Sequence, residues 1–173
     1  NAQFLLFLAA FIKGVDEYQE MLRCCVSYPG NDHRLGGNEA PPAIISIFLG
    51  DELTAILDSI IQGTAYVDIT KKKLTIGVDT LPEIPQDTTD RNRTSPLAFT
   101  GNKFEFRMLG SSQSIASPNV VLNTIMAEEL SQFADILEKA DDFQSALQTL
   151  LHDTFTAHQR IIFNGNGYDE SWV

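Results

Sequence analysis

Apolar residues recur at helical spacing along the first 27 residues of the chain. Steps of three and four residues place them along one side of a helix. The positions are Phe4, Leu8, Phe11, Val15, Tyr18, Leu22 and Cys25. The pattern predicts a single helix that ends near Ser27 and packs along one face. Because the chain enters this helix directly at Asn1, we expect it to be a fragment that begins inside a longer protein.

Shorter elements are predicted in the middle of the chain, where glycine and proline separate the apolar runs. Residues 28–42 hold three glycines and three prolines and predict a loop. Residues 43–50 favour a buried strand, and residues 51–62 favour a helix with Asp51 as its N-cap and Gly63 just after its end. Residues 65–70 and 71–79 favour two short strands, and residues 80–90 a loop.

A strict alternation of polar and apolar residues follows at residues 102–109. Lys103, Glu105 and Arg107 fall on one face of the predicted strand. Phe104, Phe106 and Met108 fall on the other. The strand therefore presents one polar, charged face.

Helical spacing returns from Pro118 onward. One helix carries an apolar side, and a second helix is predicted from about Asp142 to Ile162. The apolar positions of the first are Val121, Ile125, Leu130, Phe133 and Leu137. We expect residues 118–163 to form an antiparallel helical pair. The predicted fold class is α+β, in a single unit.

Composition narrows the possible partners. The chain has 173 residues, of which 43% are hydrophobic, and its net charge is −11. Such an acidic protein is not expected to bind nucleic acid or an anionic membrane, since both need a basic surface. The two cysteines are adjacent and lack the spacing of a disulfide framework or a metal site, which favours a reducing, cytoplasmic location.

Four cations nevertheless lie close together in the sequence, at Arg91, Arg93, Lys103 and Arg107. A carboxylate between cations, such as Glu105, can hold a divalent metal while the cations grip phosphate or carboxylate oxygens. The alternative is an exposed strand face that neutralises its own charges. Arg91 and Arg93 favour the phosphate site, because the planar fork of arginine suits polyphosphate.

The predicted loop carries a second candidate group. Arg34 and Glu39 are separated by a glycine pair that lets the backbone come close to a ligand. A mobile loop with one carboxylate could act as lid and as general base. The alternative is a surface turn with an incidental ion pair.

Three segments together resemble the glutamine synthetase family, and specifically its type III branch. "NDHRLGGNEAPPAI" resembles the family's arginine followed by a glycine-containing loop and Glu-Ala-Pro. "DRNRTSPLAFTGNKFEFR" resembles its Arg-Asn-Arg-Ser run and its Glu-x-Arg strand, and "SPNVVLNTIMAEEL" resembles the helix that follows. The resemblance covers nearly the whole chain. It implies the C-terminal portion of a catalytic domain, with antiparallel strands forming one face of the active site backed by long helices.

The resemblance also implies residue roles. Arg34 and Arg107 would bind the substrate L-glutamate, and Glu39 would close over the site and help take a proton from ammonium. Arg93, with Arg91 and Lys103, would bind ATP phosphates. Glu105 would be a ligand of Mg²⁺ or Mn²⁺. The family has a further arginine where this chain has Ala98, and residues 40–90 include an insertion like that of type III members.

The activity implied is ATP-dependent ligation of ammonia to L-glutamate through γ-glutamyl phosphate. The family further implies a homo-oligomer, a dodecamer of stacked hexameric rings. Because most of the family's metal ligands lie outside the matched segments, we expect the chain alone to be inactive. Two alternatives are a γ-glutamyl ligase that uses another amine and a non-catalytic relative that serves assembly. Retention of Arg34, Glu39, Arg93, Glu105 and Arg107 argues against the second.

Overall fold

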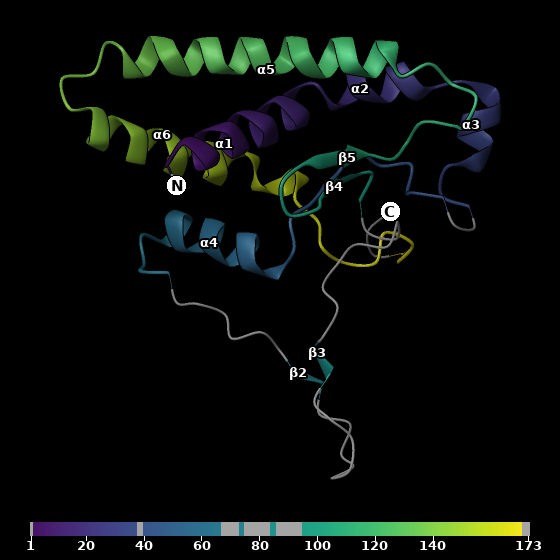
Figure 1. Ribbon diagram of the computed structural model, residues 1–173, viewed down its shortest axis with the longest axis horizontal. Coiled ribbons are helices and arrows are strands. Elements are labelled where there is room, and N and C mark those ends of the chain that lie inside the picture. The colour runs from purple at the N-terminus through teal and green to yellow at the C-terminus, as the bar shows by residue number, and fades with distance from the viewer. Residues whose placement is uncertain (1, 38–39, 67–72, 75–83, 86–94, 171–173) are drawn as a thin grey trace.

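The computed structural model describes residues 2–37, 40–66, 73–74, 84–85 and 95–170. Over these ranges the protein is mostly helical, with a small three-stranded mixed sheet (Figure 1). The elements in chain order are α1 (Ala2–Glu17), α2 (Gln19–Val26), α3 (Pro29–Arg34), β1 (Ile47–Phe48), α4 (Asp51–Gln62), β2 (Lys73–Leu74), β3 (Ile84–Pro85), β4 (Leu97–Phe99), β5 (Phe104–Phe106), α5 (Ala116–Leu137), α6 (Phe143–His158) and the 3₁₀ helix η1 (Gln159–Ile161).

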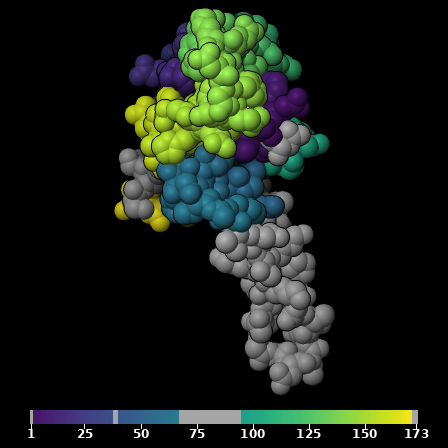
Figure 2. Space-filling model, turned by 90° about the vertical axis from the view of Figure 1, so that its left-hand side faces the viewer, coloured from purple at the N-terminus to yellow at the C-terminus, as the bar shows by residue number. Residues whose placement is uncertain are grey.

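The two long helices α5 and α6 run antiparallel, as predicted, and both pack against α1 (Figure 1). Their shared core contains fully buried side chains such as Ile12 and Phe155. α4 lies beneath α6 on the side of α6 away from α5 (Figure 2). α1 is therefore the central helix of the bundle, and its apolar seam is buried because α5 and α6 cover it.

The single helix predicted for the first 27 residues is wrong, because the chain breaks at Tyr18. Tyr18 has φ −112° and ψ 20°, outside the helical region. The Gln19 amide donates to the Asp16 carbonyl (3.0 Å), which in an unbroken helix accepts from the backbone of residue 20. A side chain that takes a helical carbonyl bends the helix. α1 and α2 are thus two helices at an angle.

The predicted loop at residues 28–42 contains a short helix, α3. Pro29 stands in its first turn, where its fixed φ suits a helix and its missing N–H costs nothing. Asp51 is not the N-cap of α4; Gly50 is, with no side-chain cap. Gly63 ends α4 in the left-handed conformation (φ 63°), as predicted.

The sheet is mixed, so the expectation of antiparallel strands is correct only in part. β4 pairs antiparallel with β5, but β1 pairs parallel with β4. The predicted strand at residues 43–50 narrows to β1, and β5 lies within the predicted strand at 102–109. The long connection through α4 allows β1 and β4 to run in the same direction.

A second, two-stranded ladder joins β2 and β3. β2 lies in the predicted strand at 71–79, whereas β3 lies in a segment predicted as loop. Of the strand predicted at 65–70, residues 65–66 are not in a strand, and the rest lies outside the described residues.

The ends of the long helices differ slightly from prediction. α5 begins two residues before Pro118. α6 begins close to Asp142, as predicted, and Asp142 caps it by accepting from the backbone N–H groups of Gln144 (3.0 Å) and Ser145 (3.3 Å). α6 ends at His158 rather than Ile162, and η1 completes the turn.

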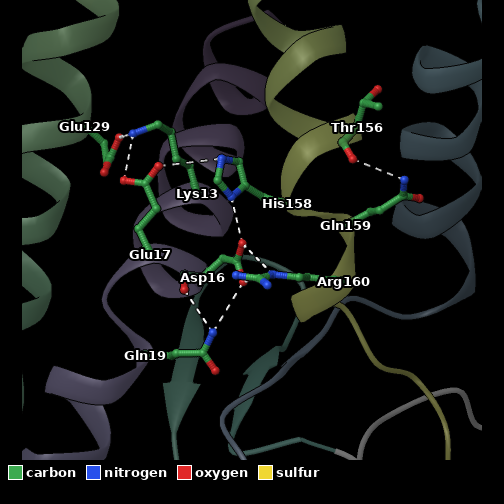
Figure 3. Close-up of polar contacts among 9 residues, drawn as sticks. All are labelled: Lys13, Asp16, Glu17, Gln19, Glu129, Thr156, His158, Gln159 and Arg160. Carbon is green, nitrogen blue, oxygen red and sulfur yellow. Dashed lines mark hydrogen bonds and ion pairs between the residues drawn. The ribbon is translucent and has the colours of Figure 1, made fainter.

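A chain of polar contacts fastens α1 to its two partners (Figure 3). Lys13 bridges Glu17 (3.1 Å) on its own helix and Glu129 of α5. Both ring nitrogens of His158 face α1, with Nδ1 2.8 Å from Asp16 and Nε2 3.7 Å from Glu17. These contacts join α1 to α5 through Glu129 and to α6 through His158.

Within the described ranges, none of the helices combines the length and apolar character needed to cross a membrane.

Candidate functional site

The charged face of β5 carries three of the predicted site residues in contact with one another. Arg107 donates to Glu105 Oε2 from Nε (3.2 Å) and from a terminal nitrogen (3.0 Å). Lys103 Nζ lies 3.2 Å from Glu105 Oε1. On the opposite face Phe104 stacks on Phe11 of α1, with ring centroids 4.0 Å apart. The two faces therefore separate as the alternation predicts.

The electrostatics of this face favour the ionised carboxylate. Hydrogen bonds from Arg107 and Lys103 hold the pKa of Glu105 below its ordinary value. The Glu105 side chain is 38% exposed, whereas that of Arg107 is 15% exposed. Arg107 is thus the fixed member of the group, and Glu105 presents an accessible anion at neutral pH.

Ala98 pairs directly with Glu105 across the β4–β5 ladder. Directly opposite residues of an antiparallel pair project to the same face. Ala98 is fully buried and carries no charge. The extra cation that the resemblance would place at this position is therefore replaced by a methyl group facing Glu105.

Arg34 is the last residue of α3, and its guanidinium reaches the strand end next to Arg107. One terminal nitrogen donates to the Met108 carbonyl (2.8 Å), and Nε donates to the Asn31 side-chain oxygen (3.0 Å). The Arg107 backbone N–H is in turn bonded to the Pro96 carbonyl (2.8 Å). The structure thus brings Arg34 beside the β5 residues, although α3 and β5 are far apart in sequence.

Asn31 is a residue at this site that sequence reasoning missed. It is 1% exposed and donates to the carbonyls of Val26 (2.8 Å) and Met108 (2.9 Å). Its side chain faces inward because residues 29–34 form a helix, which was predicted as loop. A helical interpretation of "PGNDHR" would have placed Asn31 one turn before Arg34 and on the same side.

Three predicted site residues lie outside the described residues: Glu39, Arg91 and Arg93. The backbone on each side of residues 38–39 is described, however. The hydroxyl of Tyr168 bonds the Ala40 carbonyl and lies 3.3 Å from that of Gly37. The C-terminal segment therefore contacts Gly37 and Ala40, which precede and follow residues 38–39 in the sequence.

The fit of a divalent metal to this site rests on Glu105. Ionised carboxylate oxygens are ligands that Mg²⁺ and Mn²⁺ prefer, and the lowered pKa keeps this one ionised. No group of three or more potential metal ligands occurs in the part of the chain that the structure describes. Glu105 can thus supply one ligand, and the described residues do not complete a metal site.

Comparison with known proteins bears on this geometry. The chain is 50% identical over 175 residues to a type-3 glutamine synthetase of Dictyostelium discoideum, a match that covers 99% of the chain. The chain is a homologue of type III glutamine synthetase. It is also 44% identical to glutamine synthetases of Bacteroides fragilis and Butyrivibrio fibrisolvens, over 99% and 100% of its length.

The chain matches only part of the length of each relative. The chain spans about a quarter of the length of the glutamine synthetases it matches, 24% of the Dictyostelium protein and 25% of the two others. The family model for the glutamine synthetase C-terminal domain matches residues 146–173. This range holds most of α6, all of η1 and the segment with Tyr168.

Proposed function

We propose that this chain is part of an enzyme that ligates ammonia to L-glutamate at the expense of ATP, forming L-glutamine. The observation that carries the proposal is the contact group Lys103, Glu105 and Arg107 with Arg34 at its edge. It combines one ionised carboxylate with three cations, in a chain homologous to glutamine synthetase. A dicarboxylate substrate and a polyphosphate both need such cations.

Each cation has a proposed place in this reaction. Arg34 and Arg107 bind the carboxylates of glutamate, because the Arg34 guanidinium is held at the carbonyl of Met108, the residue next to Arg107, and Arg107 is held by Glu105. Lys103, the most exposed of the group, faces the phosphates of ATP together with Arg91 and Arg93. Glu39 takes a proton from ammonium. Glu105 is a ligand of Mg²⁺ or Mn²⁺.

The proposed reaction has two steps. The γ-carboxylate of glutamate attacks the terminal phosphorus of ATP, which gives γ-glutamyl phosphate and releases ADP. Glu39 takes a proton from ammonium, and the ammonia that forms attacks the acyl carbon. The bond between the acyl carbon and the phosphate oxygen breaks, and phosphate leaves with the second proton that the nitrogen loses. Negative charge develops on phosphate oxygens in the first step and on the carbonyl and leaving phosphate oxygens in the second.

Fixed donors at these oxygens lower the barrier by about 2.7–4 kcal/mol each when well placed. The bound divalent metal would neutralise phosphate charge and align the transfer. Arg107 suits its role because it is largely buried and held by Glu105, so it needs no rearrangement when substrate binds. We further propose that the full-length enzyme is a cytoplasmic homo-oligomer, a dodecamer of stacked hexameric rings, as the family resemblance implies.

The substitution Glu105→Gln in the full-length enzyme tests this proposal. It keeps the size of the side chain but removes the charge that balances a divalent cation. We expect glutamine formation to fall and to recover in part at high Mg²⁺ concentration, whereas Glu105→Ala should not recover. The measurement is the rate of glutamine formation against metal concentration.

The matched control is Asp135→Asn, which removes the negative charge from an exposed pair between Asp135 on α5 and Lys139, two residues after that helix. It should leave the rate and the metal dependence unchanged. A Glu105→Gln enzyme with unaltered rate and metal dependence would show that Glu105 only pairs with its neighbours, a contribution of about 0–1 kcal/mol, and would remove it from the site.

A further inference from the structure

Asn31 makes a set of bonds that uses every polar function of its side chain. It is 1% exposed, and its amide nitrogen donates to the carbonyls of Val26 (2.8 Å) and Met108 (2.9 Å). Its oxygen accepts from Arg34 Nε at 3.0 Å. One buried side chain therefore joins the end of α2, the exit of β5 and the guanidinium at the end of α3.

The orientation of this amide follows from its partners. Two backbone carbonyls can only accept, so the nitrogen of the amide must face both of them. The oxygen is then the only atom left for Arg34, which can only donate. If the Asn31 amide were flipped, its oxygen would face two carbonyl oxygens and its nitrogen would face the Arg34 cation. Only one orientation of the amide therefore satisfies all three hydrogen bonds.

This arrangement fixes the plane of the Arg34 guanidinium. Nε is held by Asn31, and one terminal nitrogen is held by the Met108 carbonyl (2.8 Å), which also accepts from Asn31. Two bonds from different nitrogens define the orientation of a planar fork. Five N–H donors are available on the guanidinium, so donors remain for a ligand after both bonds are made.

We propose that Asn31 is a positioning residue that holds the guanidinium of Arg34 beside Arg107 for binding of the glutamate carboxylates. This inference rests on the proposed function, in which Arg34 contacts glutamate. It adds a role for a residue that touches neither substrate nor phosphate. Without Asn31, the Arg34 side chain would lose rotamer freedom when glutamate binds. Asn31 orders Arg34 in advance, so removing Asn31 should weaken the affinity for glutamate.

A purely structural role would give a different result, and Gln113 provides the comparison. Gln113 also bonds the Val26 carbonyl (3.4 Å), and its oxygen accepts from the Gly110 N–H (2.7 Å). It supports the same region of backbone, but the hydrogen bonds of its side chain go to Val26 and Gly110 rather than to Arg34 or Met108. Gln113→Ala is therefore the matched control for Asn31→Ala.

The experiment measures steady-state glutamine formation by the full-length enzyme, with KM for glutamate and for ATP determined separately. Asn31→Ala should raise KM for glutamate on the order of ten-fold and leave KM for ATP within about two-fold, because a misplaced binding group weakens the ligand that it contacts. Gln113→Ala should change neither value. Asn31→Ser, which keeps a hydroxyl acceptor for Arg34, should restore part of the affinity.

A double-mutant cycle with Arg34→Ala tests whether Asn31 acts through Arg34. Once Arg34 is gone, Asn31→Ala should have little further effect on KM for glutamate, because interacting residues are not additive. Thermal unfolding identifies any variant that is not folded. If Asn31→Ala does not fold, the same KM measurements are made on Asn31→Ser. Equal effects on both KM values, or full additivity with Arg34→Ala, would overturn the positioning role. A wild-type enzyme that forms no glutamine would instead refute the proposed function.

Discussion

Lys13 and Glu129 form an ion pair in the interior of the helical bundle. The Glu129 side chain is fully buried, and one of its oxygens, Oε1, has no partner among the described residues. Burial raises the pKa of this carboxyl, although Lys13 opposes the shift. Burial also lowers the pKa of Lys13, but hydrogen bonds to Glu129 and Glu17 outweigh it, so its pKa is raised. The stability of the fold therefore depends on Lys13 remaining in place.

Lys13→Met should destabilise the chain by about 3 kcal/mol at neutral pH, because it leaves a buried carboxylate without its cation. The loss should be small near pH 4. A carboxyl with a raised folded pKa contributes stability that is complete below its unfolded pKa and is lost as pH rises through the folded value. Urea unfolding of wild type and variant at both pH values measures this difference.

Two variants serve as controls for this prediction. Lys139→Met breaks an exposed pair with Asp135 and should change stability by less than about 0.5 kcal/mol. The double variant Lys13→Met/Glu129→Gln should lose the pH dependence. An equal loss of stability at pH 4 and pH 7 in Lys13→Met would show that Glu129 is not the group responsible.

The sequence contains a signal for this pair that its apolar pattern obscures. Glu129 stands four residues after Ile125 and four before Phe133, so it occupies the buried side of α5. A charged residue at such a position needs an internal partner. The alternation in residues 102–109 was a clearer signal, and it placed Lys103, Glu105 and Arg107 together correctly. Asn31 could not be found in this way, because two of its three partners are backbone carbonyls, which no side-chain pattern reveals.

At the scale of elements, α1 can lie close to α5 because residue 14 is glycine. A Cβ placed on Gly14 would come within 2.1 Å of Ile125 Cγ2 on α5. Such a contact forces the helices apart or the isoleucine out of its rotamer. The interface between these two helices therefore depends on a missing side chain.

Gly14→Ala should destabilise the chain by about 1–3 kcal/mol, although alanine favours a helix more than glycine does. Ile125→Ala should also destabilise it by leaving a cavity. The double variant should be more stable than the sum of both losses predicts, because the new methyl group fills part of that cavity. Chemical denaturation of the four proteins gives the coupling. Strict additivity would mean that Gly14 does not face Ile125.

The accuracy with which an element was predicted from the sequence increased with the length of its hydrophobic pattern. α5 and α6 have several helical turns each, and their periodicity located them to within a few residues. The strands are two or three residues long, too short for a period to emerge, and β4 was not predicted. The break at Tyr18 was missed for another reason. The apolar spacing continues through it, while a polar contact from Gln19 to the Asp16 carbonyl bends the chain.

At the scale of the whole molecule, the catalytic proposal concerns a protein longer than this chain. The chain spans about a quarter of its relatives, and the described residues hold no group of three metal ligands. We therefore expect the purified chain to form no glutamine from ATP, glutamate and ammonium with Mg²⁺. Product analysis beside the full-length enzyme measures this. Glutamine formation that requires both ATP and ammonium would refute it.

The central position of α1 has a consequence for biosynthesis. Its partner α5 begins at Ala116, and α1 ends at Glu17, a separation of 116 − 17 = 99 positions. At synthesis rates of about 5–20 residues per second, α5 follows α1 out of the ribosome after roughly 5–20 s. During that interval Leu8, Ile12 and Val15, which are buried in the finished bundle, are made but not yet covered by α5 or α6. Although α1 is made first of the described helices, it must therefore wait for α5 and α6 to be synthesised before its buried face is covered.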